Sequence, residues 1–313
     1  MERDKILLIG AGALGVFFTS KLAQAGTETA IVARGDYETA RAHGYEINDK
    51  GTVSRFQPDY VIRSAAECPF TPDYILIAAK VLPEIDPGEL TAGVPLNPST
   101  AIVLIQNGIG IEGKFARLFP KQEILSATAY LCASRPESGK VLNTGPGRLE
   151  MGCYPAGPPG AAAQRLAQLF IAGGAPCRLL DNVQTARWRK LLWNVPFNPV
   201  SVLAGGADTG RLCDGAELEK LCRDLMDEVI AAAASEGIEI LPEEADNMLA
   251  YTRSLKPYHS SMLQDYLAGR PLEVEAILGN PLRIAREHGV TVPKMEACYA
   301  LLKSIDALRR QHR

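Results

Sequence analysis

The sequence predicts an α/β protein in which a parallel-sheet domain over residues 1–180 is followed by an all-α domain over residues 181–313. In the first part, short apolar strands alternate with helical segments, a pattern typical of a parallel sheet covered by helices on both faces. In the second part, the apolar residues follow helical spacing, and no convincing strand occurs. A length of 313 residues with 47% hydrophobic residues also suits two cores better than one.

The expected elements follow in order along the chain. The apolar run "KILLIG" predicts a buried first strand, and a helix from Ala13 to Ala25 closes at Gly26. Further strands are expected at 28–34, 73–80, 100–108 and 123–133, with a last strand and a Pro/Gly turn in 148–160. A helix over 161–174 completes the first domain. The second domain is expected to contain helices at 183–203, 215–236, 243–255, 258–268 and 272–288.

Composition excludes several classes of protein. The net charge is −3 and the pI is near 5.9, so nucleic acid is not an expected partner. The seven cysteines are widely spaced and form no C-x-x-C pair, which indicates reduced thiols in a cytoplasmic protein without a metal site. No apolar run reaches about 18 residues, and the N-terminal run enters a glycine turn. Neither a membrane span nor a signal peptide is therefore expected.

A glycine-rich turn follows the first strand. Gly10, Gly12 and Gly15 in "GAGALG" have the G-x-G-x-x-G spacing and lie between a strand and a helix, the context that a dinucleotide site requires. Gly10 permits the tight turn, Gly12 lets a pyrophosphate approach the backbone, and Gly15 lets helix and strand pack closely. The helix N-terminus favours the phosphate charge. The alternative is a glycine-rich turn without a ligand, but the context favours a Rossmann-type domain.

The end of the second strand indicates which dinucleotide is bound. An NAD site usually places an acidic residue here for the ribose hydroxyls, whereas Arg34 suits a 2′-phosphate. The sequence therefore favours NADP. Asp36 lies two residues further on and is close enough to the ribose to weaken this inference.

Two more polar residues follow expected strands. Lys80 ends "DYILIAAK" and Asn107 ends "TAIVLIQNG". Ligands of such sheets bind at the carboxyl ends of the strands, which makes both residues candidates for cofactor contacts. Asn107-Gly108 is also an ordinary turn dipeptide.

The segment "ARWRKLLWNVPFN" carries the main candidates for chemistry. Lys190, Asn194 and Asn198 are four residues apart and share one face of a helix. A protonated lysine can stabilise the negative charge that builds on a ketone oxygen during reduction, and can then donate its proton. The two amides can hold a carboxylate or hydroxyl. The alternative is a solvated basic turn beside a core stripe, and Pro196 is expected to kink the helix and to shift Asn198 from the ideal face.

A later segment, "YHSSMLQDYLAGRPLEVEAILGNP", adds Ser260 or Ser261 as a helix cap or substrate ligand. Glu273 and Glu275 are two residues apart, so on a helix at most one of them faces a site. Taken alone, this run is more typical of caps and solvated charges than of chemistry.

These motifs together resemble the ketopantoate reductase (2-dehydropantoate 2-reductase) family over nearly the whole chain. "GAGALG", "AR", "AAK", "QNGIG", "WRKLLWNVPFNP", "SSMLQD" and "LEVEAILG" occur in the family's order and spacing, and the ordered set is specific. The resemblance implies a 6-phosphogluconate-dehydrogenase-like fold, in which a Rossmann-type domain precedes a helical domain and the active site lies between them. It further implies NADPH-dependent reduction of a small 2-keto acid, ketopantoate, with a homodimer as the possible assembly.

The resemblance also implies roles for individual residues. Lys190 would donate the proton, and Glu273 would hydrogen-bond near the reacting centre. Substrate would contact Asn194, Asn198, Ser261 and the position of Asp208. NADP would contact Gly10, Ala11, Gly12, Ala13, Leu14, Gly15, Arg34, Lys80, Asn107 and Cys132.

Three positions depart from the family pattern. Asp208 stands where the family has an asparagine that helps to bind substrate, and a carboxylate there would repel an anionic substrate. Pro196 is not part of the usual pattern, and Cys132 occupies a small-residue position near the nicotinamide. Asp208 therefore bears on the choice of substrate more than on the class of reaction.

Three competing interpretations remain. A β-hydroxyacid or 6-phosphogluconate-type dehydrogenase shares Lys-x-x-x-Asn but usually has a glycine-rich run before the lysine, where this chain has "QTARWR". A histidine-based 2-hydroxyacid dehydrogenase needs a His–carboxylate pair, for which the four histidines offer no persuasive candidate. A protein that only senses a dinucleotide would have no need of Lys190 and Glu273 together.

Overall fold

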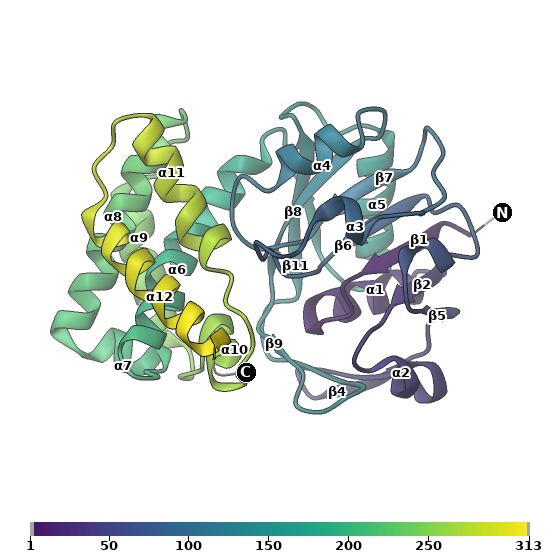
Figure 1. Ribbon diagram of the computed structural model, residues 1–313, viewed down its shortest axis with the longest axis horizontal. Coiled ribbons are helices and arrows are strands. Elements are labelled where there is room, and N and C mark those ends of the chain that lie inside the picture. The colour runs from purple at the N-terminus through teal and green to yellow at the C-terminus, as the bar shows by residue number, and fades with distance from the viewer. Residues whose placement is uncertain (1–2, 312–313) are drawn as a thin grey trace. The chain divides into compact units, whose positions relative to one another are not determined.

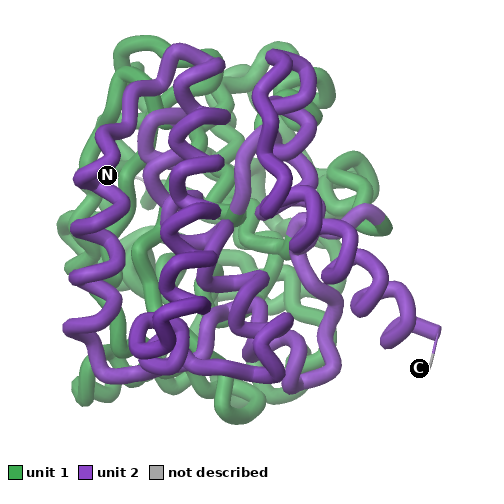
Figure 2. Tube along the Cα trace, turned by 90° about the vertical axis from the view of Figure 1, so that its left-hand side faces the viewer, with its two compact units in different colours: residues 1–80, 84–107, 112–183 green, residues 81–83, 108–111, 184–313 purple. Residues whose placement is uncertain are grey.

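The computed structural model describes residues 3–311, and the chain divides into two compact units (Figures 1 and 2). Unit 1 contains residues 1–80, 84–107 and 112–183, and unit 2 contains residues 81–83, 108–111 and 184–313. The main division follows Val183, near the expected boundary after residue 180. The grouping of the short segments 81–83 and 108–111 with the helical unit was not predicted from the sequence.

Unit 1 is built on an eight-stranded sheet with the strand order β12-β11-β8-β7-β6-β1-β2-β5. The six strands from β8 to β5 run parallel, whereas β11 runs antiparallel to β8 and β12 runs parallel to β11. When the six parallel strands are numbered by their order along the chain and read from β5 to β8, their order is 3-2-1-4-5-6, as in a Rossmann domain. The strands are β1 (Lys5–Ile9), β2 (Glu28–Val32), β5 (Tyr60–Ile62), β6 (Tyr74–Ile77), β7 (Ala101–Leu104), β8 (Ile124–Tyr130), β11 (Arg148–Tyr154) and β12 (Cys177–Leu179).

The central strands are apolar throughout because both faces of the sheet are covered. Side chains alternate across a strand, and Ile6 and Leu8 of β1 join the core that contains Phe18 and Phe170. Leu7 and Ile9 point to the other face and are buried as well. The helices of this unit are α1 (Ala13–Gln24), α2 (Tyr37–His43), η1 (Ala65–Glu67), α3 (Pro87–Leu90), α4 (Glu112–Leu118) and α5 (Ala161–Ala172).

A second, four-stranded sheet of unit 1 was not predicted from the sequence. Its order is β4-β3-β10-β9, formed by β3 (Tyr45–Asp49), β4 (Thr52–Phe56), β9 (Ala133–Ser134) and β10 (Lys140–Asn143). The side chain of Asn143 is fully buried and donates to Asp49 Oδ1 at 2.9 Å. Lys21 of α1 forms an ion pair with the other oxygen of Asp49 at 2.9 Å, which ties the small sheet to the first helix.

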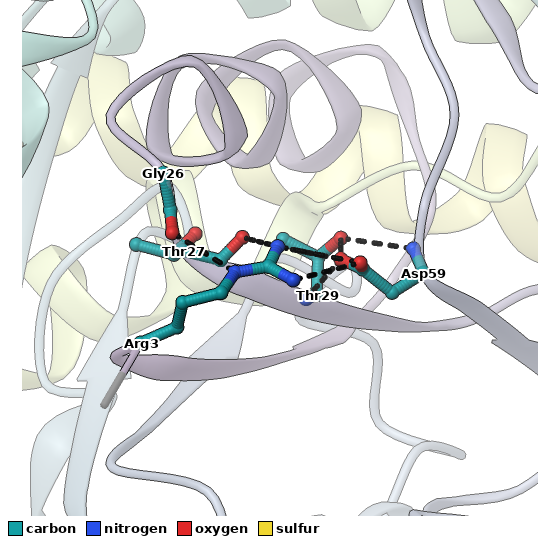
Figure 3. Close-up of polar contacts among 5 residues, drawn as sticks. All are labelled: Arg3, Gly26, Thr27, Thr29 and Asp59. Atoms are coloured by element: carbon teal, nitrogen blue, oxygen red, sulfur yellow. Dashed lines mark hydrogen bonds and ion pairs between the residues drawn. The ribbon is translucent and has the colours of Figure 1, made fainter. Parts of the chain in front are cut away.

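The edge of the large sheet at β2 and β5 is held by Arg3 and Asp59 (Figure 3). Arg3 donates to the carbonyl oxygens of Gly26 and Thr27 and forms an ion pair with Asp59. Asp59 Oδ2 accepts hydrogen bonds from the backbone N–H of Thr29 at 2.8 Å and from its hydroxyl at 3.1 Å. This cluster fixes β2, the strand that leads to Arg34.

Unit 2 consists of helices packed around one apolar core, with Trp188, Leu191 and Val195 among its buried residues. Helix α6 (Val183–Leu203) continues through Pro196 and Pro199. The remaining elements are α7 (Thr209–Asp214), α8 (Ala216–Ser235), α9 (Pro242–Ser254), α10 (Ser261–Leu267), η2 (Glu275–Gly279), α11 (Asn280–Glu287) and α12 (Pro293–Gln311).

The expected fold class is confirmed, with a parallel sheet followed by a helical region in which residues 181–311 form no strand. Several expected elements were incomplete or wrong. The segment 148–160 does not hold the last strand, because β12 follows it. The run 123–133 is interrupted between β8 and β9, and 272–288 contains the π-helical turn η2 before α11.

Candidate active site

Candidate cofactor residues follow five neighbouring parallel strands of unit 1. Gly10, Arg34, Lys80, Asn107 and Cys132 come after β1, β2, β6, β7 and β8, respectively. The strands pair in the order β2-β1-β6-β7-β8, so their carboxyl ends share one edge of the sheet. Ligands of doubly wound sheets bind at that edge.

The glycine turn is built for close packing at two positions and is open at the third. Gly10 has φ +105°, and a Cβ there would lie 2.2 Å from the Ala79 nitrogen. A Cβ on Gly15 would lie 2.4 Å from the carbonyl oxygen of Gly10. Gly12, the N-cap of α1, has no atom within 4 Å of its Cβ position. The backbone beside Gly12 is thus accessible to a phosphate, next to a helix N-terminus that favours negative charge.

The ends of β6 and β7 are joined by Gln106, whose side-chain amide donates to the Ala79 carbonyl oxygen at 2.6 Å. Lys80 and Asn107 are both partly exposed and follow the linked strand ends. Cys132 is also partly exposed, and its carbonyl oxygen accepts the backbone N–H of Thr144 at 3.1 Å. Lys80, Asn107 and Cys132 are thus accessible in part at the carboxyl ends of the strands, and contact with a dinucleotide stays a prediction for each of them.

Arg135, which contacts the glycine turn, was not among the residues singled out from the sequence. It donates from Nη1 to the Ala11 carbonyl oxygen at 2.9 Å and from Nη2 to Asp36 Oδ2 at 2.7 Å. Asp36 is buried, whereas Arg34, two residues earlier, is exposed. No motif marks Arg135 because it follows the two-residue strand β9 in an irregular segment.

In unit 2, the basic triplet of α6 separates into three environments. Arg187 is 3% exposed and donates to the Gly108 carbonyl oxygen at 2.8 Å. Arg189 is exposed and forms an ion pair with Glu244 at 2.8 Å. Lys190 is partly buried and lies on the helix face of Asn194 and Asn198. The triplet is therefore not a uniformly solvated turn.

Asn198 meets the start of α10. Its Oδ1 lies 3.4 Å from both the Ser261 hydroxyl and the Met262 backbone nitrogen, which donate to it. The residue is 1% exposed, and its Nδ2 finds no hydrogen-bond acceptor within the described part of the chain. A buried amide donor in this state is costly unless an acceptor is supplied.

The neighbouring serines have different tasks. Ser260 caps α10 by accepting the Leu263 N–H at 3.1 Å, and its hydroxyl lies 2.7 Å from that of Ser201. Ser260 is thus occupied in structure, whereas Ser261 lies beside Asn198. Ser260 is therefore the helix cap, and a substrate contact of Ser261 stays a prediction.

Glu273 and Glu275 are also in different environments. Glu273 is buried, and its Oε1 accepts the Val81 backbone N–H at 3.0 Å. Glu275 accepts a hydrogen bond from the Tyr299 hydroxyl at 2.7 Å and pairs with Lys303 at 3.2 Å. Of the two glutamates, Glu273 is therefore the buried candidate. The nearby Asp265 is paired with Arg270 at 2.8 Å.

Asp208 is the N-cap of α7, and its Oδ1 accepts the Arg211 backbone N–H at 2.9 Å. Thr209 is tied to Tyr258 by two hydrogen bonds, both 3.0 Å long. The departure at position 208 therefore has a local structural task that an asparagine oxygen would also perform.

The described residues contain no group of three or more His, Cys, Asp or Glu side chains arranged to hold a metal ion. No helix within residues 3–311 is long and apolar enough to cross a membrane.

Comparison with known proteins identifies the family. Residues 6–156 match the family described as ketopantoate reductase PanE/ApbA, and residues 182–306 match its C-terminal family. The 2-dehydropantoate 2-reductase of Nostoc sp. is 32% identical over 320 residues, covering 99% of this chain and 98% of the relative. The crystal structure of 2-dehydropantoate 2-reductase from Methylococcus capsulatus is 38% identical, with a TM-score of 0.88 and 97% coverage of both chains.

A D-mandelate dehydrogenase solved with NADH and anilino(oxo)acetate has a TM-score of 0.87 over 98% of this chain and 99% of that chain, but it is 23% identical and shows likeness of fold alone. The matched family and the Rossmann-type sheet define the class of the protein as an oxidoreductase. Within that class, the chain belongs to the ketopantoate reductase family.

Proposed function

We propose that this protein reduces 2-dehydropantoate (ketopantoate) to pantoate with NADPH, a step of pantothenate and coenzyme A biosynthesis. The observation that carries the proposal is the buried Nδ2 of Asn198, which has no acceptor among residues 3–311 and lies one helical turn beyond Asn194 and two beyond Lys190. An oxygen-rich substrate supplies the acceptor that this amide requires. The family of the chain supports the same substrate.

Lys190 is the proposed proton donor. As the carbonyl carbon gains a hydride, the ketone oxygen acquires negative charge, which a protonated Nζ stabilises and then neutralises by donating a proton. The ketone becomes a hydroxyl group, and the neutral lysine regains a proton from water. Trp193, partly buried against the apolar core, lies three residues after Lys190 on α6, so its ring is the apolar neighbour of the lysine on the helix surface.

Asn194, Asn198, Ser261 and Glu273 are the proposed substrate-binding and orienting groups. The Nδ2 of Asn198 and the hydroxyl of Ser261 are donors suited to carboxylate or hydroxyl oxygens. Glu273 is an acceptor suited to the terminal hydroxyl of ketopantoate. The buried side chains of Val195 and Phe197 are the proposed apolar wall for the geminal methyl groups.

Unit 1 fits a dinucleotide because Gly12 leaves its backbone open while Gly10 and Gly15 are required by packing. NADPH supplies the hydride when bound. The proposed contacts are Gly10 to Gly15 for the pyrophosphate, Arg34 for the 2′-phosphate, and Lys80, Asn107 and Cys132 along the remaining strand ends. The exposed guanidinium of Arg34 favours NADPH over NADH.

Steady-state reduction of ketopantoate and 2-ketoisovalerate tests the substrate. The second compound keeps the branched carbon but lacks the hydroxymethyl group, so it leaves polar groups of the pocket unpaired. We expect a much higher kcat/KM for ketopantoate, and Asn198→Ala and Glu273→Ala should reduce that preference. Equal kcat/KM for the two acids would remove the ketopantoate assignment.

The cofactor is tested separately. Wild type should have a higher kcat/KM with NADPH than with NADH. The Arg34→Ala variant should have a higher KM for NADPH and a smaller difference between the two kcat/KM values. A wild-type preference for NADH would contradict the role of Arg34.

A second candidate substrate is an aromatic 2-keto acid. Trp193 stacks on Phe197 with ring centroids 5.1 Å apart, and on Tyr258 at 6.0 Å. Trp193 is three residues from Lys190, so the stack flanks the proposed proton donor. Including benzoylformate in the substrate panel separates the candidates, because a higher kcat/KM for it than for ketopantoate would favour the aromatic acid.

The cellular setting and assembly remain predictions. Seven free cysteines and the biosynthetic role support a cytoplasmic protein. A homodimer is tested by sedimentation of the purified chain.

A further inference from the structure

Arg135 connects the glycine turn with the carboxylate that follows β2. Its Nη1 donates to the Ala11 carbonyl oxygen at 2.9 Å, and its Nη2 forms a 2.7 Å ion pair with Asp36 Oδ2. The side chains of Asp36 and Arg135 are 7% and 27% exposed, respectively. The pair is therefore shielded from solvent more than an ordinary surface ion pair.

Asp36 lies shortly after β2, at the position that distinguishes NAD from NADP in Rossmann domains. A carboxylate shortly after the second strand of a Rossmann domain hydrogen-bonds the ribose hydroxyls of NAD and repels the 2′-phosphate of NADP. In this chain, Arg135 forms an ion pair with one oxygen of that carboxylate and neutralises its charge. Arg34, two residues before Asp36, is exposed.

The surroundings of Asp36 reinforce its dependence on Arg135. Tyr45 is fully buried next to it, and burial together with the negative charge of Asp36 raises the pKa of the phenol, so this neighbour stays neutral. Arg135 is the cation that the structure pairs directly with Asp36. Without that cation, the negative charge would be left beside the proposed phosphate-binding arginine.

We propose that Arg135 is a specificity-determining residue that favours NADP(H) over NAD(H) by neutralising Asp36. This inference rests on the proposed dinucleotide-dependent function. Arg135 acts through Asp36, so its removal should change the discrimination between the two dinucleotides and not merely weaken both.

The test measures Kd values of the full-length protein for NADP⁺ and NAD⁺ by isothermal titration calorimetry, with 2′,5′-ADP and 5′-ADP as shorter probes. Arg135→Met keeps the length of the side chain but removes its charge. We expect the preference for NADP⁺ to fall by about tenfold or more, because an unpaired carboxylate then faces the phosphate. Arg135→Lys should keep most of the preference.

The double variant Arg135→Met/Asp36→Asn separates charge neutralisation from direct phosphate binding. If Arg135 acts through Asp36, removing the carboxylate should restore the wild-type ratio of Kd values to within about threefold. Arg165→Met is the matched control, because Arg165 pairs with Asp4 on an exposed part of the same unit and should leave the ratio unchanged.

Two outcomes would overturn the inference alone: an equal loss for both dinucleotides in Arg135→Met, or a double variant that stays as impaired in its ratio as the single one. Thermal melts identify misfolding, and Arg135→Gln provides a second charge-free side chain. Failure of wild type to bind either dinucleotide would overturn the proposed function together with this inference, so the two failures are distinguishable.

Discussion

Arg187, Arg189 and Lys190 are close in sequence but occupy a buried, an exposed and an intermediate environment on α6. If Lys190 is the proton donor, Lys190→Ala should lower kcat by about a hundredfold or more while NADPH binding survives. Arg189→Ala is the matched control, because an exposed ion pair with Glu244 contributes little. Stopped-flow rates and Kd values for both variants provide the measurement, and near-normal turnover of Lys190→Ala would exclude the assigned role.

Asp208 carries both a helix cap and a charge, and two substitutions separate them. The Asp208→Asn variant keeps a side-chain oxygen for the Arg211 N–H, so stability should change little. Loss of the negative charge should lower KM for an anionic 2-keto acid if position 208 lies near the substrate. Asp208→Ala should instead cost about 1 kcal/mol of stability through the lost cap. An unchanged KM in Asp208→Asn would place the carboxylate outside the substrate's reach.

Residue types and spacing were sufficient to nominate Lys190, Asn194 and Asn198, because a four-residue spacing on a helix is a local property. The hydrogen bonding of the Asn198 amide was not predictable from local spacing, since its neighbours Ser261 and Met262 lie more than sixty residues away along the chain. Arg135 was missed for the same reason: its partners Ala11 and Asp36 come from distant segments.

At the scale of elements, the central strands were predictable because burial on both faces makes them continuously apolar, as in "KILLI". The small sheet was missed because its strands are short and partly exposed: β4 has one buried residue of five, and β9 has only two residues. Strand β12 is also short, with three residues. The pairing of β3 with β10, which completes the small sheet, joins segments that are far apart along the chain, and local sequence carries little trace of it.

The glycine turn permits a paired test of packing against ligand access. A Cβ at Gly15 would lie 2.4 Å from a carbonyl oxygen, so Gly15→Ala should destabilise unit 1 by about 1–3 kcal/mol. Gly12→Ala meets no protein atom within 4 Å and has ordinary φ, so it should leave Tm nearly unchanged but weaken NADP binding. Calorimetric melts and Kd values check both; unaltered NADP affinity in Gly12→Ala would argue against phosphate contact there.

The Arg3–Asp59 cluster at the sheet edge predicts a pH-dependent contribution to stability (Figure 3). Burial alone would raise the pKa of Asp59, but hydrogen bonds from Thr29 and Arg3 outweigh it and lower the pKa. Because the folded-state pKa is depressed, the stabilisation is present above the unfolded pKa, near 4, and is lost as pH falls through the folded value.

Asp59→Asn should therefore cost about 1–2 kcal/mol at pH 7 and progressively less in acid, as measured by urea unfolding across pH. Glu38→Gln, which removes an exposed ion pair with Arg63, is the control and should change stability by less than about 1 kcal/mol. A pH-independent difference between Asp59→Asn and wild type would contradict the ionic origin.

At the scale of the whole molecule, sequence periodicity was able to separate a sheet-containing part from a helical part, because each has its own apolar core. It did not reveal that residues 81–83 and 108–111 pack with the helical unit. Glu273 binds the Val81 N–H, Arg187 binds the Gly108 carbonyl oxygen, and Ile109 is buried in the apolar core of the helical unit. The segment after Asn107 is therefore held by polar and apolar contacts with residues far away along the chain.

The distribution of thiols over both units gives the last prediction. Cys68, Cys213, Cys222 and Cys298 are buried, and burial raises the pKa of Cys222 to about 12 and that of Cys298 to about 11. Cys177 is partly exposed, but burial raises its pKa to about 12, and burial also raises the pKa of Cys153. Because the thiolate is the reactive form, these cysteines should react slowly with an aromatic disulfide reagent at pH 8.

Cys132, partly exposed after β8 at the proposed cofactor edge, should therefore account for the fast phase of native thiol labelling. Cys132→Ser should remove that phase, NADP⁺ should slow it, and denaturant should make all seven cysteines reactive. Cys153→Ser is the matched control and should leave the fast phase intact. Labelling kinetics followed by peptide mass spectrometry assign the sites. Fast labelling of Cys222 or Cys298 in the native protein would show that the helical core opens far more readily than its packing indicates, and a Cys132 rate indifferent to NADP⁺ would argue against a cofactor beside β8.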